Sequence, residues 1–282
     1  MKHLSTARKS IYRRTAELTA VFTLLASMVP SSSFAELPYQ LLNTYPHQPA
    51  LFTQGLELYQ GKLYESSGLY GYSKVLARNF PPSPTDSIKG TALPPDVFAE
   101  GLSQYRGKLY VLTWKGGRGL IIDPQHFKLL GAFSYEGEGW GLCASIATGR
   151  PDHFVMSNGT SQLQWLSTDT MTLINTVTVT EKGKAVDHLN ELECLGEYVV
   201  ANQWHSDYLF IIDGRSGKVL SKLNLSALTA DVNASTPLAP EAVLNGIAYD
   251  AGDHSWLVTG KLWPSIFRIT FTLPALPIQS RP

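Results

Sequence analysis

The segment Phe52-Thr-Gln54-Gly-Leu56 occurs again, almost unchanged, as Phe98-Ala-Glu100-Gly-Leu102. Three looser copies follow along the chain, and they read Glu138-Gly-Trp140-Gly-Leu142, Leu189-Asn190-Glu-Leu192 and Leu244-Asn245-Gly-Ile247. Their key positions, 54, 100, 140, 190 and 245, are separated by 46, 40, 50 and 55 residues. A repeat of this length indicates an array of similar structural units.

Each copy opens a unit that contains further short apolar segments separated by turns. The second segment is nearly identical in the first two units, as Tyr59-Gln-Gly-Lys-Leu-Tyr64 and Tyr105-Arg-Gly-Lys-Leu-Tyr110. Third and fourth segments follow in most units, for example at 120–122 and 129–133. Short strands with turns at intervals of roughly 8–12 residues predict an all-β, five-bladed β-propeller with four-stranded blades. A β-sandwich or barrel that repeats by chance is the alternative fold.

The propeller prediction brings distant residues together. The first strand of each blade lines the central channel, so we expect the five key residues to lie near one mouth of it: Gln54, Glu100, Trp140, Asn190 and Asn245. We expect residues 39–45 to complete the last blade, because the segment 266–272 runs at once into a Pro-rich tail. No long amphipathic helix is predicted.

The first 35 residues have the pattern of a cleavable secretory signal. Five basic residues within 1–14 precede the uncharged stretch Leu18–Val29, and small residues stand at Ser33 and Ala35. We predict cleavage after Ala35, a catalytic propeller domain over residues 36–282, and a periplasmic or secreted location. An uncleaved anchor is the alternative, although the apolar stretch is short for a bilayer span of about 20 residues.

The mature chain would carry a small negative charge. The signal removes five of the 23 basic residues and one of the 23 acidic residues, which leaves 18 against 22. Without a basic stripe, we expect no nucleic-acid partner. We also expect no membrane association after cleavage and a monomeric state.

The two cysteines, Cys143 and Cys194, are expected to stay unpaired. Cys143 lies three residues after Trp140, whereas Cys194 lies four residues after Asn190. Strand side chains alternate between faces, so this difference places the two thiols on opposite sides of their blades.

Tryptophan and lysine side chains occupy matching positions in three units. Trp114 follows Glu100 by 14 residues, Trp204 follows Asn190 by 14, and Lys261 follows Asn245 by 16. We expect them at equivalent strand ends beside the channel mouth, with Trp263 as a weaker candidate. The HExxH, GxSxG, phosphate-loop and EF-hand motifs are absent and the seven histidines are scattered, so we expect no cofactor and no metal.

The motifs closely resemble those of the plant and bacterial glutaminyl cyclases, also called glutamine cyclotransferases. The resembling segments cover nearly all of residues 46–268 and read FTQGLEL, LYESSGLYGYS, FAEGL, LYVLTWK, GEGWGLC, HLNELE, ANQW, LNGIAYD and VTGKLWP. The resemblance implies a five-bladed propeller, in agreement with the repeat count. It also implies that Glu100 transfers protons and that the other site residues form the pocket: Phe52, Gln54, Trp114, Trp140, Asn190, Trp204 and Lys261.

The implied reaction converts N-terminal glutamine of peptides and proteins to pyroglutamate with loss of ammonia. Because the nucleophilic amine is already tethered to the carboxamide, the enzyme mainly holds a reactive rotamer and moves protons. Glu100 is suited to both proton transfers, and Lys261 and Asn190 are suited to stabilise the oxyanion. Glu138 lies near the same mouth but off the key position, so we expect it to contribute far less.

Two other functions remain open from the residues alone. A non-catalytic peptide-binding propeller scaffold would not need Glu100 and Lys261 at one mouth. A metal-dependent propeller lactonase or hydrolase would bind a divalent cation through Asp, Glu and Asn assembled from distant positions. Ammonia release from a peptide with N-terminal glutamine separates the scaffold from the cyclase, and a chelator would abolish the activity of the metal-dependent enzyme.

Overall fold

The computed structural model describes residue 1 and residues 36–83, 85–146 and 151–277. The predicted signal segment and its cleavage site therefore lie, apart from Met1, outside the described residues. All the described strands belong to the unit Phe34–Pro282. Among the described residues, no helix is both long enough and apolar enough to cross a membrane.

The described strands form five four-stranded antiparallel sheets, each of which is one blade. The strands of blades 1 and 2 are β2 (Thr53–Tyr59), β3 (Lys62–Ser67), β4 (Lys74–Asn79), β5 (Lys89–Ala92), β6 (Ala99–Tyr105), β7 (Lys108–Thr113), β8 (Arg118–Ile122) and β9 (Leu129–Ser134). Those of blades 3 and 4 are β10 (Leu142–Ser145), β11 (His153–Ser157), β12 (Gln162–Ser167), β13 (Leu173–Thr178), β16 (Leu189–Leu195), β17 (Tyr198–Gln203), β18 (Tyr208–Asp213) and β19 (Val219–Asn224). Blade 5 contains β20 (Leu244–Asp250), β21 (Ser255–Gly260), β22 (Ser265–Thr270) and β1 (Gln40–Pro46).

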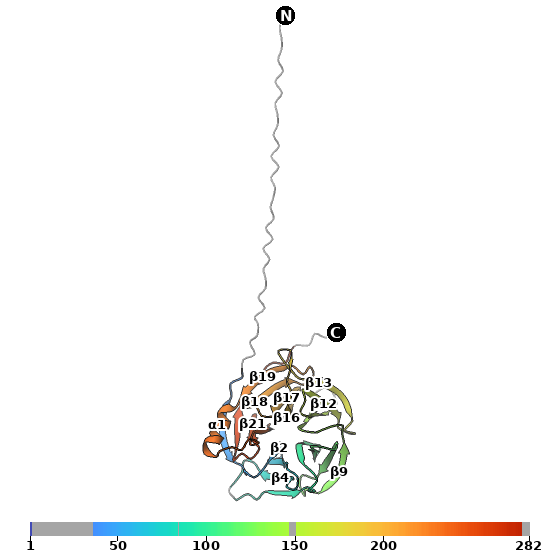
Figure 1. Ribbon diagram of the computed structural model, residues 1–282, viewed down its shortest axis with the longest axis vertical. Helices are drawn as coiled ribbons and strands as arrows, with labels where there is room; N and C mark the ends of the chain where they lie inside the picture. Colours follow the sequence, from blue (N-terminus) through green and yellow to red (C-terminus); the bar gives the residue numbers. More distant parts are fainter. Residues whose placement is uncertain (2–35, 84, 147–150, 278–282) are drawn as a thin grey trace. The chain divides into compact units, whose positions relative to one another are not determined.

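The blades form a closed ring around a central axis (Figure 1). Their first strands touch in the order β2, β6, β10, β16 and β20, and β20 returns to β2. The N-terminal strand β1 pairs antiparallel with β22 and becomes the outer strand of the last blade. The expected closure by residues 39–45 is therefore confirmed, and the predicted five-bladed propeller is confirmed with it. Because the N-terminal strand completes the C-terminal blade, the two ends of the chain hold the ring closed.

The hydrophobic core is divided into five clusters, and each lies between neighbouring blades. Between blades 2 and 3, for example, the ring centroids of Tyr110 and Phe154 are 4.7 Å apart. Between blades 5 and 1, Leu56 packs with Leu257 and Ile266. Because every blade buries both faces, the strands are apolar on both sides, which explains why the repeat shows little strict alternation.

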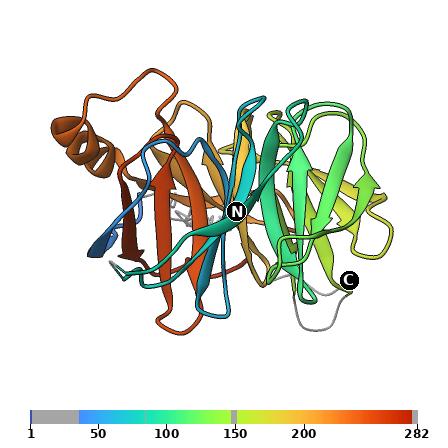
Figure 2. The ribbon, with the colours of Figure 1, turned by 90° about the horizontal axis from the view of Figure 1, so that it is seen from below.

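One helix and one small hairpin decorate the ring. Helix α1 (Ser226–Ser235) lies at the periphery between blades 4 and 5 (Figure 2), and it buries only Leu228 and Val232. Two buried residues one turn apart are too few to make an amphipathic pattern in the sequence. The hairpin consists of β14 (Thr180–Glu181) and β15 (Lys184–Ala185).

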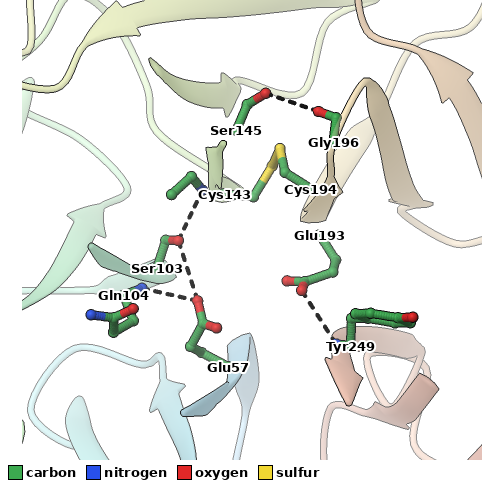
Figure 3. Close-up of a disulfide and its surroundings, with 10 residues drawn as sticks. Glu57, Ser103, Gln104, Cys143, Ser145, Glu193, Cys194, Gly196 and Tyr249 are labelled. Atoms are coloured by element: carbon green, nitrogen blue, oxygen red, sulfur yellow. Dashed lines mark hydrogen bonds between the residues drawn. A yellow bond between two sulfur atoms is a disulfide. The ribbon is translucent and has the colours of Figure 1, made fainter. Parts of the chain in front are cut away.

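A disulfide joins Cys143 on β10 to Cys194 on β16 (Figure 3), so the expectation of unpaired thiols is wrong. The two Cα atoms are 5.4 Å apart, within the normal range for a disulfide. The one-residue register difference is real, since Cys143 follows Leu142 directly whereas Cys194 follows the equivalent Leu192 by two. Adjacent blades, however, pack face to face, so the surfaces that meet are opposite faces of equivalent strands. The offset therefore turns the two thiols toward each other, into the cluster between blades 3 and 4.

Candidate active site

A pocket of about 370 Å³ opens at one end of the ring. Its lining contains every residue that the family resemblance assigned to the site: Phe52, Gln54, Glu100, Trp114, Trp140, Asn190, Trp204 and Lys261. It also contains three residues that were not assigned: Leu69, Phe98 and Glu241. Side chains from all five blades therefore meet around one cavity.

The opening motifs place the first group of side chains. Gln54, Glu100, Trp140 and Asn190 each stand two residues before the buried leucine of their motif. Glycine follows the key residue in blades 1, 2, 3 and 5, and at Gly101 an added Cβ would lie 2.6 Å from the Leu142 nitrogen. The Gly101 amide donates to the Trp140 carbonyl oxygen at 2.6 Å. Only glycine permits this approach of neighbouring first strands, which brings the key side chains together.

The ends of the second strands place the remaining group. Val111, Ala201 and Val258 pair with the motif residues Leu102, Leu192 and Ile247. Three residues later stand the pocket residues of blades 2, 4 and 5, which are Trp114, Trp204 and Lys261. The equivalence inferred from their spacing is therefore confirmed by the strand register.

Blades 1 and 3 have glycine where these pocket residues stand. An added Cβ at Gly68 would lie 2.4 Å from the ring of Phe98, and one at Gly159 would lie 2.6 Å from the indole of Trp140. The two glycines thus leave room for large aromatic side chains that stand just before the first strands of blades 2 and 3. The second-strand ends of blades 2, 4 and 5 therefore carry large side chains, whereas those of blades 1 and 3 carry glycine and leave space for a neighbouring ring.

The backbone turns sharply beside the pocket. Leu69, His205 and Leu262 immediately follow these strand ends and have φ values of 90°, 58° and 60°. Residues other than glycine seldom adopt this left-handed region, and such strain gathers at functional sites. The Leu262 amide is held by the Leu51 carbonyl oxygen at 2.7 Å.

The three unassigned lining residues differ in how far the sequence signals them. Phe98 occupies the same motif position in blade 2 that Phe52 occupies in blade 1, so the repeat could have identified it. Leu69 follows the second-strand end of blade 1 as His205 and Leu262 do in blades 4 and 5, but its residue type differs from theirs, and Glu241 lies in the long connection between α1 and β20. Glu241 is paired with His205 at 3.8 Å, and both side chains are about half exposed.

Two candidate residues lie outside the lining. Asn245 is buried behind Gln54, and its Nδ2 donates to the Thr53 carbonyl oxygen at 2.9 Å and to Gln54 Oε1 at 3.5 Å. Trp263 is fully buried in the core between blades 4 and 5, and its Nε1 donates to the Ala242 carbonyl oxygen. Asn245 supports the pocket from behind, whereas Trp263 belongs to the core.

Glu100 and Lys261 are opposite charges in a largely apolar cavity, and each is only 4% exposed. Burial raises the pKa of the Glu100 carboxyl well above its usual range; the positive charge of Lys261 opposes this shift, and the negative charge of Glu138 adds to it. Burial likewise lowers the pKa of Lys261, against the charges of Glu100 and Glu241. Desolvation thus outweighs the attraction between the pair. The Glu100 carboxyl therefore keeps its proton to a higher pH than an exposed glutamate does.

Aromatic rings form most of the wall. Phe98 and Trp114 have ring centroids 5.5 Å apart, and Trp140 and Trp204 meet edge to face at 5.8 Å. The Lys261 Nζ lies 4.8 Å from the centroid of the Phe52 ring, within cation–π range. The wall is therefore largely apolar, and it holds the lysine over an aromatic face.

Asn190 contributes a polar group without an internal partner. Its side chain is 2% exposed, and its Oδ1 has no hydrogen-bond partner in the described part of the chain. Buried polar atoms in native proteins nearly always have a partner. An amide left incompletely bonded beside a cavity is consistent with a contact to a bound molecule.

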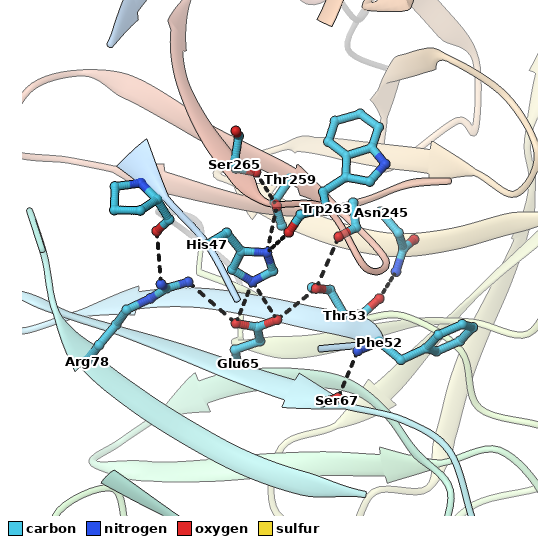
Figure 4. Close-up of polar contacts among 12 residues, drawn as sticks. His47, Phe52, Thr53, Glu65, Ser67, Arg78, Asn245, Thr259, Trp263 and Ser265 are labelled. Carbon is cyan, nitrogen blue, oxygen red and sulfur yellow. Dashed lines mark hydrogen bonds and ion pairs between the residues drawn. The ribbon is translucent and has the colours of Figure 1, made fainter. Parts of the chain in front are cut away.

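A buried ionic network supports the pocket where the ring closes (Figure 4). The His47 imidazole lies between the Trp263 carbonyl oxygen, 2.7 Å from Nδ1, and the Glu65 carboxylate, 3.1 Å from Nε2. Thr53 donates to Glu65 Oε1 at 2.7 Å, and the Arg78 guanidinium lies 3.7 Å from Oε2. The network therefore connects the strand that carries Gln54 to the loop that carries Lys261.

Within the described ranges, no group of three or more His, Cys, Asp or Glu side chains is arranged to hold a metal ion. The polar groups of the pocket are one carboxyl, one ammonium and two amides, with a second carboxyl at Glu241. Such a set is suited to proton transfer and to hydrogen bonding with an amide or peptide.

Comparison with known proteins agrees with this site. The profile of the glutamine cyclotransferase family matches residues 15–271. A glutaminyl-peptide cyclotransferase of Arabidopsis thaliana is 34% identical over 233 residues, which are 82% of this chain and 70% of that protein. The crystal structure of Myxococcus xanthus glutaminyl cyclase superimposes with a TM-score of 0.74 at 34% identity, and the match covers 83% of this chain and 96% of that one. The chain therefore belongs to the glutamine cyclotransferase family of enzymes.

Proposed function

We propose that this enzyme cyclises N-terminal glutamine of peptides and proteins to pyroglutamate, with release of ammonia, with Glu100 as the proton carrier and without a metal ion. Family membership supports the reaction class. The observation that carries the mechanism is Glu100, a buried carboxyl with a raised pKa in an aromatic pocket beside a buried lysine.

The proposed reaction begins with the neutral α-amine of the substrate and the Glu100 carboxylate. The amine nitrogen attacks the γ-carboxamide carbon, and a new carbon–nitrogen bond forms as the carbonyl π electrons move to oxygen. Glu100 accepts one proton from the attacking nitrogen and then donates it to the departing nitrogen. The carbon–nitrogen bond to that group breaks, ammonia leaves, and Glu100 is again a carboxylate.

Lys261 and Asn190 are proposed to stabilise the oxyanion of the tetrahedral intermediate. The Lys261 ammonium is buried, so its interaction with a developing negative charge is stronger than in water. The Asn190 amide provides a second polar contact, and its incompletely bonded side chain supports this role. Gln54, held by Asn245, is proposed to orient the substrate.

The aromatic side chains are proposed to position the reacting residue and exclude bulk water. Phe52, Trp114, Trp140 and Trp204 wall the cavity. Excluding water favours ring closure over hydrolysis of the carboxamide. A tethered nucleophile held between aromatic walls also needs little further ordering to reach the reactive geometry.

Export of the chain is proposed from its first 35 residues. We infer that a signal peptide is removed after Ala35, that the mature enzyme works in the periplasm or outside the cell, and that it is a monomer. It would bind peptide or protein N-termini rather than nucleic acid or membrane. N-terminal sequencing of protein from a periplasmic or culture fraction should begin at Glu36, and an uncleaved chain in the membrane fraction would contradict this.

The reaction is tested with a short peptide that has N-terminal glutamine. The purified protein should release ammonia in equal amount to the pyroglutamyl peptide, as followed by mass spectrometry. The matched control is the same peptide with an acetylated α-amine, which lacks the nucleophile and should release none. Equal ammonia release from both peptides would identify an amidase instead.

Metal independence is tested separately. After dialysis against EDTA, the cyclisation rate should remain near its starting value, because the proposed oxyanion contacts are Lys261 and Asn190. A loss of activity that zinc specifically restores would reject this mechanism while leaving the overall reaction in place.

A further inference from the structure

Glu138 holds two indoles of the pocket wall. It lies in the loop between β9 and β10, and its Oε2 accepts hydrogen bonds from Trp114 Nε1 at 2.9 Å and from Trp140 Nε1 at 3.1 Å. The two tryptophans come from neighbouring blades, so one carboxylate oxygen connects the wall across the gap between blades 2 and 3. Hydrogen bonds to an ionised acceptor are stronger than neutral ones.

The position of Glu138 in the repeat is informative. It stands two residues before the key residue Trp140, where blades 1 and 2 have Phe52 and Phe98. Those two phenylalanines contribute apolar surface to the pocket directly. In blade 3 a carboxylate replaces the ring and acts on the wall through the indoles that it bonds.

The loop around Glu138 is itself well held. The Gly139 amide donates to the Trp114 carbonyl oxygen at 3.3 Å, and the Trp140 amide donates to the Ser157 carbonyl oxygen at 2.9 Å. Gly159 leaves the space that the Trp140 indole fills. The carboxylate is thus fixed by its backbone before any substrate enters.

Glu138 also acts on the reaction centre through its charge. Its negative charge contributes to the raised pKa of Glu100, in the opposite direction to Lys261. Glu138 therefore acts on the site in two ways: it orients the two indoles, and it helps to raise the pKa of Glu100.

We propose that Glu138 is a positioning residue, which locks the Trp114 and Trp140 indoles in the orientation that receives the glutaminyl side chain. The proposal rests on the cyclisation function given above, but its hydrogen bonds can be measured without turnover. Glu138→Gln removes the charge and keeps the shape. The matched control is Glu136→Gln, two residues earlier in the same loop at an exposed position.

The first readout is the indole N–H resonances of the ligand-free protein. The chain has six tryptophans, and Trp114→Phe and Trp140→Phe assign the two signals of interest. Both should move upfield in Glu138→Gln, because a neutral amide is a weaker acceptor than a carboxylate, and neither should move in Glu136→Gln. Unchanged signals in Glu138→Gln would overturn the proposal.

The second readout is the pH profile of kcat/KM for a peptide with N-terminal glutamine. In Glu138→Gln we expect a loss on the order of tenfold, the scale of one charge-assisted hydrogen bond. Because Glu100 enters the cycle ionised, losing the charge that raises its pKa should also move the acidic limb of the profile down, by on the order of 0.5–1 pH unit. Glu136→Gln should match the parent in both respects.

Failure of the Glu138 role and failure of the cyclase function give different results. Shifted indole signals with unchanged kinetics would make Glu138 merely structural and would refute its role in the reaction. A parent protein that releases no ammonia would refute the cyclase function, while the indole signals would still report the hydrogen bonds. If Glu138→Gln does not fold, Glu138→Asp, which keeps the charge on a shorter side chain, should lose activity without moving the acidic limb; a moved limb there would contradict the proposal.

Discussion

Replacing Glu100 by glutamine should abolish most of the activity while leaving the fold intact. Glutamine has the same shape and can accept hydrogen bonds, but it has no proton to transfer at neutral pH. General acid–base groups contribute about 10²–10⁴-fold to rate. We therefore expect kcat to fall at least about a hundredfold, which corresponds to roughly 2.7 kcal/mol of lost transition-state stabilisation.

The same change should not destabilise the protein. The pKa of Glu100 is raised in the folded state by burial, so the parent loses stability as the pH rises above the value at which the unfolded carboxyl ionises. Glutamine carries no charge at any pH and avoids this loss. Thermal unfolding of Glu100→Gln should thus occur at or above the parental temperature at pH 8, and the advantage should shrink toward pH 4.5.

The assay is ammonia release under saturating peptide, with stability followed by circular dichroism. Glu136→Gln, exposed in the loop before β10, serves as the control and should keep parental activity. Glu138→Gln should lie between the two variants. If Glu100→Gln kept most of the activity while Glu138→Gln lost it, the proton carrier would be misassigned. If Glu100→Gln unfolded, the residue would be structural and the reasoning from its burial would fail.

Three further predictions concern stability. Because Cys143 and Cys194 are 51 residues apart, Cys143→Ser should lower the free energy of unfolding in urea by roughly 3–4 kcal/mol. The denatured parent should show two thiols only after reduction, and two thiols without reductant would disprove the bond. Burial raises the pKa of Glu57 to about 7, so its ionisation should lower the free energy of unfolding of the parent by up to about 3 kcal/mol between pH 4.5 and 8. In urea titrations, Glu57→Gln should reduce this dependence of stability on pH. An unaltered dependence would exclude Glu57 as its source. His47→Ala leaves the buried Glu65 without its main partner and should lower the free energy of unfolding by about 3 kcal/mol, as measured by chemical unfolding. A parental midpoint would show that Arg78 and Thr53 satisfy the carboxylate without the imidazole.

The sequence predicted which residues gather at the pocket because the fold is a repeat, whereas the roles of these residues came from the resemblance to glutaminyl cyclases. Each unit makes its own strands from local apolar segments and turns, so the period predicted five blades. Closure by the N-terminal strand was predicted from the Pro-rich tail that follows the segment 266–272. The repeat also aligned Gln54, Glu100, Trp140 and Asn190, and it aligned Trp114, Trp204 and Lys261 at a second set of strand ends. Equivalent positions in a ring meet at the axis, whatever their separation along the chain.

Contacts between units were decided only by the tertiary structure. The cysteines have the register that the sequence indicates, but whether that register joins or separates them depends on blades packing face to face. Glu241 reaches the pocket from the connection between α1 and β20, which has no repeat counterpart, and Glu138 bonds indoles from two blades at once. The elevated pKa of Glu100 likewise depends on how completely neighbouring blades desolvate it. Local periodicity specifies each blade, whereas these features arise from close packing between blades, which no single repeat encodes.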